Sequence, residues 1–173
     1  MDALRDRFER EAVPHMRAVY NVALRLTLCD ADARDLLQDT FLRAYQHFDR
    51  FTAGTNCRAW LFTIAYSIFV NRYRKNRREA QVIRASDGAD PPPPGGDASR
   101  ARARVEADVE QALAELPEEF RATILLVDVE DCSYEEAASA LGCAVGTIRS
   151  RLFRARKHLA ARLRDYAGAR LGV

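Results

Sequence analysis

Apolar residues recur at intervals of three and four along most of this chain, which is the spacing of amphipathic helices. No stretch convincingly alternates apolar and polar residues, as a half-buried strand requires. We therefore expect an all-α fold built from small helical domains. Two stripes near the start predict two packed helices: Val13, Met16, Tyr20, Ala23 and Thr27, then Ala33, Leu36, Leu37, Phe41, Ala44, Tyr45 and Phe48.

A third helix is predicted to begin at Thr55 or Asn56, since both residue types are acceptable N-caps, and to run through Arg78. Its apolar residues cover about half of the helix circumference. They leave a narrow polar strip that leads into a basic run at 72–84. The strip consists of Thr63, Ser67, Asn71, Arg74 and Arg78.

Four prolines followed by two glycines interrupt the helical pattern between Ala85 and Arg104, where almost nothing is apolar. We interpret 85–104 as a flexible linker. It divides the chain into an N-terminal domain, 1–84, and a C-terminal domain, 105–173. At about 3.3 Å per residue the extended linker reaches roughly 65 Å, so that one chain could touch two sites on a duplex.

The second domain ends in a pattern typical of a helix-turn-helix. Ser133 and Glu136 form a capping box that opens a short helix, and Gly142 closes it. A longer helix begins at Val145, with its apolar stripe at Ile148, Leu152, Ala155 and Leu159. Earlier stripes predict two further helices: Val105, Val109, Ala112, Leu113 and Leu116, then Phe120, Ile124 and Val127.

The formal charge is only +2, from 27 Lys and Arg against 25 Asp and Glu, but the charges are segregated along the chain. Residues 105–140 hold eleven acids and one base, Arg121, whereas residues 145–164 hold seven bases and no acid. Basic patches concentrate polyanions. The two basic stretches, 72–84 and 145–164, therefore indicate two contacts with nucleic acid.

The last predicted helix carries the clearest candidate site. Opposite its apolar stripe, or at one edge of that face, lie Gly146, Arg149, Ser150, Phe153, Arg154, Arg156 and Lys157. An aromatic residue opposite the core is costly to leave in water, and the major groove admits a helix whose arginines pair with guanine. This combination favours DNA recognition over a merely solvated basic face.

The polar strip of the third helix has two interpretations. Four aromatic residues surround it: Phe51, Trp60, Phe62 and Tyr66. Aromatic stacking combined with hydrogen bonds to exposed base edges suits the binding of unpaired bases. Periodicity alone instead favours a place in the core for most of these aromatics.

The outer face of the second predicted helix is also ambiguous. It carries two carboxylates around one exposed leucine, in the set Asp35, Gln38, Asp39, Leu42 and Gln46. Acid–base or metal chemistry is weakly supported, because the two acids lie four residues apart on an open face without a glycine-rich phosphate loop. A docking face for a basic protein partner is more economical, and a solvated face is the alternative.

No cofactor or metal site is indicated. The four cysteines, Cys29, Cys57, Cys132 and Cys143, are scattered, and we expect buried thiols rather than zinc ligands, disulfides or a redox switch. No apolar run approaches the roughly 18 residues of a membrane span, and the charged segment Met1–Glu11 lacks the apolar centre of a signal peptide. We expect a cytoplasmic protein.

Three segments resemble the extracytoplasmic-function (ECF) sigma factors, the two-domain bacterial subunits that direct RNA polymerase to promoters. DARDLLQDTFLRAYQHFDRF, residues 32–51, is similar to their polymerase-binding segment. RAWLFTIAYSIFVNRYRKNRR, residues 58–78, is similar to the segment that melts and reads the minus-ten element. LPEEFRATILLVDVEDCSYEEAASALGCAVGTIRSRLFRAR, residues 116–156, resembles the helix-turn-helix domain for the minus-thirty-five element.

The resemblance implies a role for each candidate surface. At the minus-thirty-five element it implies base contacts from Arg149, Ser150, Phe153 and Arg154, and phosphate contacts from Thr147, Arg151 and Lys157. Around a flipped minus-ten base it places His47, Arg50, Phe51, Trp60, Phe62, Thr63, Ser67 and Asn71. It implies that the clamp helices of core RNA polymerase are bound by Asp35, Gln38, Asp39 and Leu42. It also implies that the acidic part of the second domain contacts the polymerase flap.

The resemblance further implies an alternative sigma factor that acts by binding and not by catalysis, together with an anti-sigma partner. Two other classes compete. A dimeric repressor or activator would use the same helix-turn-helix, but it needs neither a second DNA-reading domain nor a long linker. An enzyme would need a nucleophile–base pair or a metal cluster, and the sequence shows neither.

Overall fold

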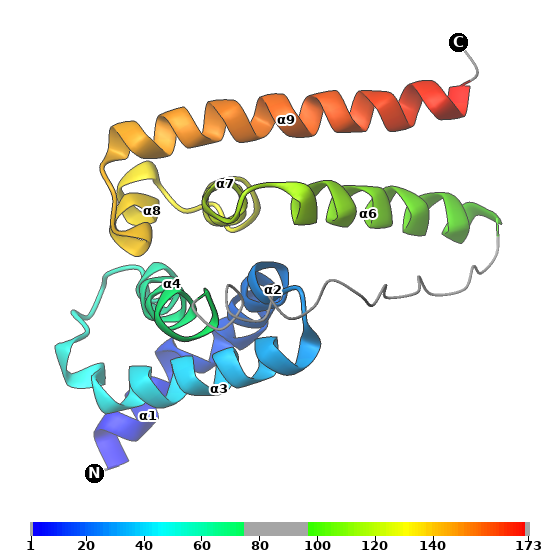
Figure 1. Cartoon of the computed structure of the whole chain (residues 1–173). Coiled ribbons are helices and arrows are strands. Elements are labelled where there is room, and N and C mark those ends of the chain that lie inside the picture. The colour runs from blue at the N-terminus through cyan, green and yellow to red at the C-terminus, as the bar shows by residue number, and fades with distance from the viewer. Residues whose placement is uncertain (1, 75–96, 172–173) are drawn as a thin grey trace.

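The computed structural model describes residues 2–74 and 97–171, with side chains for 3–72 and 106–164. Within these ranges every regular element is helical, which confirms the expected all-α fold of two small domains (Figure 1). The first domain holds α1 (Asp2–Glu11), η1 (Val13–His15), α2 (Met16–Thr27), α3 (Asp30–Gln46), η2 (Phe48–Arg50), α4 (Cys57–Ile68) and η3 (Phe69–Arg74). The second holds α6 (Asp97–Glu115), α7 (Glu118–Ile124), η4 (Leu125–Val129), α8 (Tyr134–Leu141) and α9 (Val145–Leu171).

The core of the first domain forms where α2, α3 and α4 meet. Ala23, Leu36 and Leu61, one from each helix, are buried there, as the apolar stripes predict. Val13 and Met16, from the predicted stripe of the first helix, are instead exposed. Asn56, one of the two predicted N-caps, opens α4: its side-chain oxygen accepts a hydrogen bond from the backbone N–H of Ala59 at 3.2 Å. This bond satisfies one of the amide groups that a helix start leaves unpaired.

The helix α1 is not predicted by the apolar pattern, because the segment is mostly charged. Its Phe8 is nevertheless buried and packs edge-on against three aromatic rings. Those rings belong to Phe41, Tyr45 and Phe48, with centroids at 6.2, 5.2 and 5.1 Å. Arg7 of the same helix donates a hydrogen bond to the Phe51 carbonyl at 3.3 Å. Phe8 and Arg7, and not an apolar stripe, therefore dock this helix on the domain.

In the second domain α6 and α9 run side by side, and α7 lies near them with α8 beside the start of α9 (Figure 1). The predicted capping box is present: the Ser133 hydroxyl accepts from the Glu136 N–H at 3.1 Å, and the Glu136 carboxylate accepts from the Ser133 N–H at 2.8 Å. Gly142 ends α8 with φ of 62°, a left-handed conformation that favours glycine. The short turn then leads directly into α9.

The predicted linker is wrong at its C-terminal end. The helix α6 already begins at Asp97, so 97–104 is helical. Alanine and arginine, which dominate that stretch, have high intrinsic helix propensity and extend the helix backwards from its packed portion. The rest of the predicted linker, 85–96, and the basic run beyond Arg74 lie outside the described residues.

The two domains pack face to face, with α4 against α8 and α2 against α7 (Figure 1). Phe62 and Tyr66 of α4 share an apolar cavity with Leu126 and Leu141 of the second domain. Only 1% of Phe62 is exposed. The apolar surface of α4 is therefore divided between the core of its own domain and the boundary between domains.

Arg121, the lone base of the acidic segment, is 3% exposed. Its guanidinium donates to the backbone carbonyl of Ala114 at 2.9 Å and to that of Leu26, in the last turn of α2, at 3.4 Å. A cation near the C-terminal end of a helix is favoured by the helix dipole. Arg121 thus links the second domain to the first through backbone groups.

Three polar pairs across the boundary join a first-domain donor to a second-domain acid: Arg25 with Glu110, Asn56 with Glu136, and Arg58 with Glu130. The Arg58–Glu130 separation is 3.6 Å. Burial raises the pKa of Glu130 and outweighs the opposite influence of Arg58. Burial therefore disfavours the charged form of Glu130, and the attraction of Arg58 offsets this cost only in part.

Candidate nucleic-acid interface

The helix α9 has the two faces that its sequence predicts. Ile148, Leu152 and Ala155 are buried against the rest of the domain. Phe153, in contrast, is 71% exposed. The polar and basic residues around Phe153 are exposed as well: Arg149, Ser150, Arg154 and Lys157. An aromatic side chain surrounded by cations on an open helix is a surface suited to the major groove.

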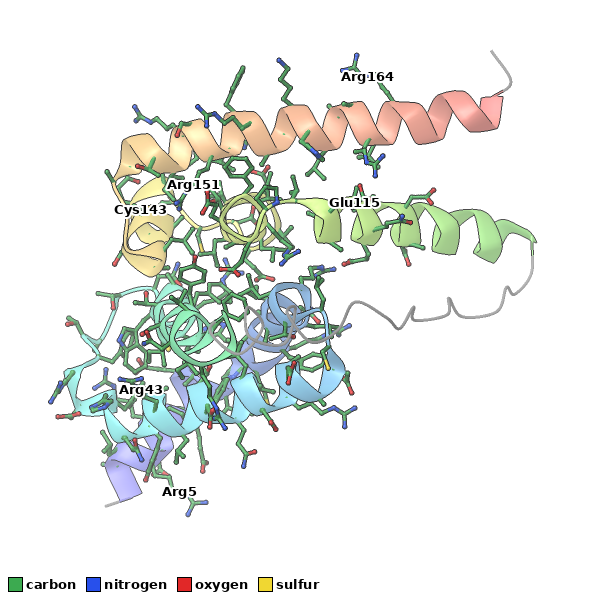
Figure 2. All side chains as sticks on the ribbon, viewed as in Figure 1. Arg5, Arg43, Glu115, Cys143, Arg151 and Arg164 are labelled. Atoms are coloured by element: carbon green, nitrogen blue, oxygen red, sulfur yellow. The ribbon has the colours of Figure 1, made fainter. Side chains whose placement is uncertain are left out.

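Thr147 and Arg151, which flank the face around Phe153, are less exposed than its other residues. Thr147 is half-buried, and its carbonyl accepts a hydrogen bond from the Ser150 hydroxyl at 3.0 Å. Arg151 lies on the side of α9 that faces the domain, near Cys143, as Figure 2 shows. Its guanidinium comes within 4.0 Å of the Glu119 carboxylate. A phosphate contact by Arg151 would therefore compete with an acid of its own domain.

Arg156 lies at the edge of the exposed face of α9, and it is paired with an acid. Its Nε and Nη2 donate to the two carboxylate oxygens of Asp128, at 2.9 and 2.6 Å. Asp128 lies in the π-helical segment η4, and its hydrogen bonds to the guanidinium raise the pKa of Arg156. The sequence pattern does not predict a partner for Arg156. The acidic segment before the basic helix indicates only that opposite charges could meet in this domain.

The polar strip of α4 is only partly open. Ser67 and Asn71 are exposed, whereas Thr63 is half-buried and its hydroxyl donates to the Ala59 carbonyl at 3.1 Å. Arg50 is exposed and His47 is half-buried. These five residues lie on α4 and η3 or on the segment after α3.

The three aromatics assigned to the same site lie elsewhere. Phe51 is buried, and it stacks on Phe48 with the ring centroids 5.4 Å apart. Trp60 is half-buried beside both rings, at 5.1 Å from Phe51. Phe62 faces the domain boundary. In this arrangement none of the three offers an open ring face beside Ser67, which agrees with the core interpretation that periodicity favours.

The outer face of α3 is an apolar groove with a polar rim. Leu42 is 56% exposed, and Asp35 and Gln38 are exposed beside it. Asp39 is half-buried and forms an ion pair with Arg72 of η3. The groove is lined by Met16, Arg34, Leu37, Gln38, Phe41 and Leu42. Met16 and Phe41, which the stripes assign to the core, contribute to this surface.

The cysteines occupy different environments. Cys57 and Cys132 are buried, and burial raises the pKa of each thiol to about 11. A thiol so far from ionisation is a poor nucleophile. Cys143 is half-buried, whereas Cys29 is exposed, so the expectation of buried thiols is wrong for Cys29. None of the helices in 2–74 and 97–171 has the length and apolar character needed to cross a membrane.

Comparison with protein families identifies both domains. The Sigma-70 region 2 family matches residues 13–79, and the Sigma-70 region 4 family matches residues 106–159. The ECF RNA polymerase sigma factor EcfG of Rhodopseudomonas palustris is 40% identical over 162 residues, which cover 94% of this chain and 86% of that protein. SigE of Mycolicibacterium smegmatis is 36% identical over 154 residues, covering 88% of this chain and 58% of its own length.

Solved structures share the fold. The sigma factor RpoE of Bartonella quintana, solved with the anti-sigma factor NepR, has a TM-score of 0.72 at 35% identity and covers 91% of this chain and 96% of that one. CnrH, solved with the cytosolic domain of CnrY, has a TM-score of 0.67 at 28% identity, covering 93% and 90%. This chain therefore belongs to the ECF RNA polymerase sigma factors, and it is an alternative sigma factor that directs promoter-specific transcription.

Proposed function

We propose that α9 reads the minus-thirty-five element in the major groove. The observation that carries this role is the exposed Phe153 within a basic face. Base contacts fall to Arg149, Ser150, Phe153 and Arg154, and phosphate contacts to Thr147, Arg151 and Lys157. A bidentate arginine–guanine contact and an apolar contact with a thymine methyl would supply the sequence selectivity.

The first domain captures unpaired bases of the minus-ten element. The exposed polar groups of Ser67, Asn71 and Arg50 support this role, together with the half-buried His47 and Thr63. Phe51, Trp60 and Phe62 contribute open ring faces only after rearrangement, and for Phe62 this means separation of the two domains. Flipping a base costs unstacking energy, which the many contacts of the bound state offset.

The groove on α3 docks on the clamp helices of core RNA polymerase. Asp35, Gln38 and Asp39 provide acceptors for basic side chains, and Leu42 provides an apolar anchor of the kind that protein interfaces bury at their centre. The acidic part of the second domain meets the polymerase flap. The chain works by binding alone, without a cofactor, in the cytoplasm where RNA polymerase acts, and an anti-sigma protein holds it inactive.

Run-off transcription with purified core polymerase over a genomic promoter library tests this assignment. We expect defined start sites with the wild-type chain and their loss with Leu42→Glu, which places a carboxylate in the docking groove. Leu163→Glu is the matched control, because Leu163 is also exposed but lies far along α9. Failure of the wild-type chain to associate with core polymerase would overturn the proposal.

Polymerase-free binding to a palindrome would point instead to a dimeric repressor or activator. That outcome is readily distinguished, because a dimer binds two half-sites one helical turn apart. The same preparation used for transcription serves for this measurement.

A further inference from the structure

The recognition helix is held by arginine–acid pairs on both sides of its buried seam. On one side Arg156 forms a two-pronged pair with Asp128 of η4. On the other side Arg162 pairs with Glu115 of α6, and Arg151 lies 4.0 Å from Glu119 of α7. Figure 2 shows Glu115 on α6, on the side that α9 covers. Of these three arginines, only Arg151 is also among the proposed DNA contacts.

The Arg156–Asp128 pair has the geometry to fix the rotation of α9. A guanidinium and a carboxylate joined by two parallel hydrogen bonds restrict both distance and orientation. The arginine also lies beside Tyr134 at the start of α8. Arg156 therefore connects α9 to η4 and lies beside α8.

Small rotations of α9 would matter for reading bases. Side-chain tips lie about 6 Å from a helix axis, so a rotation of about 10° moves them by roughly 1 Å. Recognition geometry tolerates only about 0.5 Å before contacts weaken. The buried seam of Ile148, Leu152 and Ala155 is aliphatic, and its contacts are non-directional. The guanidinium–carboxylate pair adds a directional contact beside it.

We propose that Arg156 is a positioning residue for minus-thirty-five recognition: its pair with Asp128 sets the rotation of α9 on the domain, and Arg156 does not itself contact the DNA. The inference rests on the proposed reading of DNA by α9. It separates the arginines of this helix into two groups. Arg149 and Arg154 face the groove, whereas Arg156 is committed to an acid of its own domain.

The central experiment removes the acid and leaves the arginine. We would measure binding of the full chain to a duplex that the wild type selects from random sequences, and to a scrambled duplex, over a series of salt concentrations. For Asp128→Asn we expect the ratio of the two affinities to fall about tenfold, with an unchanged salt dependence. If Arg156 were a DNA contact, removing its competing acid would leave the ratio intact or strengthen binding to both duplexes.

Four further variants complete the design. Arg156→Ala should match Asp128→Asn, and the double variant should lose no more than either single variant, because the two residues act as one unit. Lys157→Ala should instead weaken both duplexes equally and reduce the salt slope by about 0.9, as loss of one phosphate contact does. Glu9→Gln, which breaks the exposed Arg5–Glu9 pair on α1, is the matched control and should change nothing.

The outcomes separate the inference from the proposed function. A wild-type chain that fails to prefer any duplex would contradict DNA reading by α9. A different result would overturn the positioning role alone. In that case the wild type is selective, but Arg156→Ala reduces the salt dependence of binding by the amount expected for one lost phosphate contact. Thermal unfolding of each variant checks that the fold is intact, because exposed ion pairs contribute only about 0–1 kcal/mol to stability.

Discussion

The two DNA-reading regions of this protein differ in how far they are already formed. The recognition helix presents Phe153, Arg149 and Arg154 on one open face of a continuous helix. The residues proposed to read the minus-ten element are instead distributed over α4, η3 and the segment after α3, and the three aromatics among them are packed against other groups. Reading a duplex needs only a rigid rod that fits a groove, whereas capturing an unpaired base needs a pocket assembled from several segments.

This difference has an energetic side. The face of α9 costs little to keep open, because its charged neighbours are solvated and only Phe153 is strongly apolar. The aromatics of the first domain would expose much more apolar surface if they were left open without DNA, and burying them stabilises the free protein. Base capture must therefore compete with the packing of the same domain.

The largest expected effect lies in that packing. Phe48 is fully buried and contacts Phe8, Phe51 and Trp60. Phe48→Ala should lower the unfolding free energy of the first domain by about 3–5 kcal/mol, because a large cavity remains. Trp60 is the only tryptophan, so urea titration followed by its fluorescence reports on this region. An unchanged midpoint would mean that the cluster is not the core of the domain.

Arg149→Ala should act on binding and not on folding. Loss of a base contact in the major groove costs about 1–3 kcal/mol and relaxes selectivity at one base pair. Competition between selected and point-substituted duplexes measures the effect. Arg164→Ala, further along α9, is the control and should retain full selectivity. Unchanged transcription from the cognate promoter with Arg149→Ala would refute the groove assignment.

Ser133→Ala tests how strongly the turn depends on its cap. The Ser133 hydroxyl satisfies the Glu136 N–H, and its removal should destabilise the second domain by about 1 kcal/mol. Ser139→Ala, at an exposed position of the same helix, provides the comparison. Denaturation followed by circular dichroism gives the difference. Equal stabilities of the two variants would show that the capping box contributes nothing measurable.

The smallest effect is expected at the domain boundary. Because burial raises the pKa of Glu130, the folded protein holds this proton more tightly than the unfolded chain. The associated stability is present below pH 4.5 and is lost as pH rises through the higher folded pKa. Glu130→Gln should flatten this part of the stability–pH curve. It should also raise the free energy of unfolding slightly near pH 7, where the wild-type carboxylate is charged. A curve identical to the wild type's would contradict the desolvation of Glu130.

Local patterns predicted what depends on a few neighbouring residues. The stripe of Ile148, Leu152 and Ala155, the Ser133 capping box and the turn at Gly142 are all present, because periodicity and capping act within one or two turns of helix. The helix α1 was not predicted, because it docks through Phe8 and Arg7 and not through an apolar stripe. The early start of α6 was not predicted, because the prolines and glycines before Asp97 led us to interpret all of 85–104 as a linker.

The sequence by itself determined the helical fold, the open basic face of α9 and, through its motifs, membership of the sigma factor family. Only the tertiary structure decided which aromatics of α4 are buried, that Phe62 faces the other domain, and that Arg156 is paired with Asp128. The physical reason is that hydrophobic periodicity reports which side of a helix is apolar but not what covers it. A charge pair between elements 28 residues apart likewise leaves no local pattern.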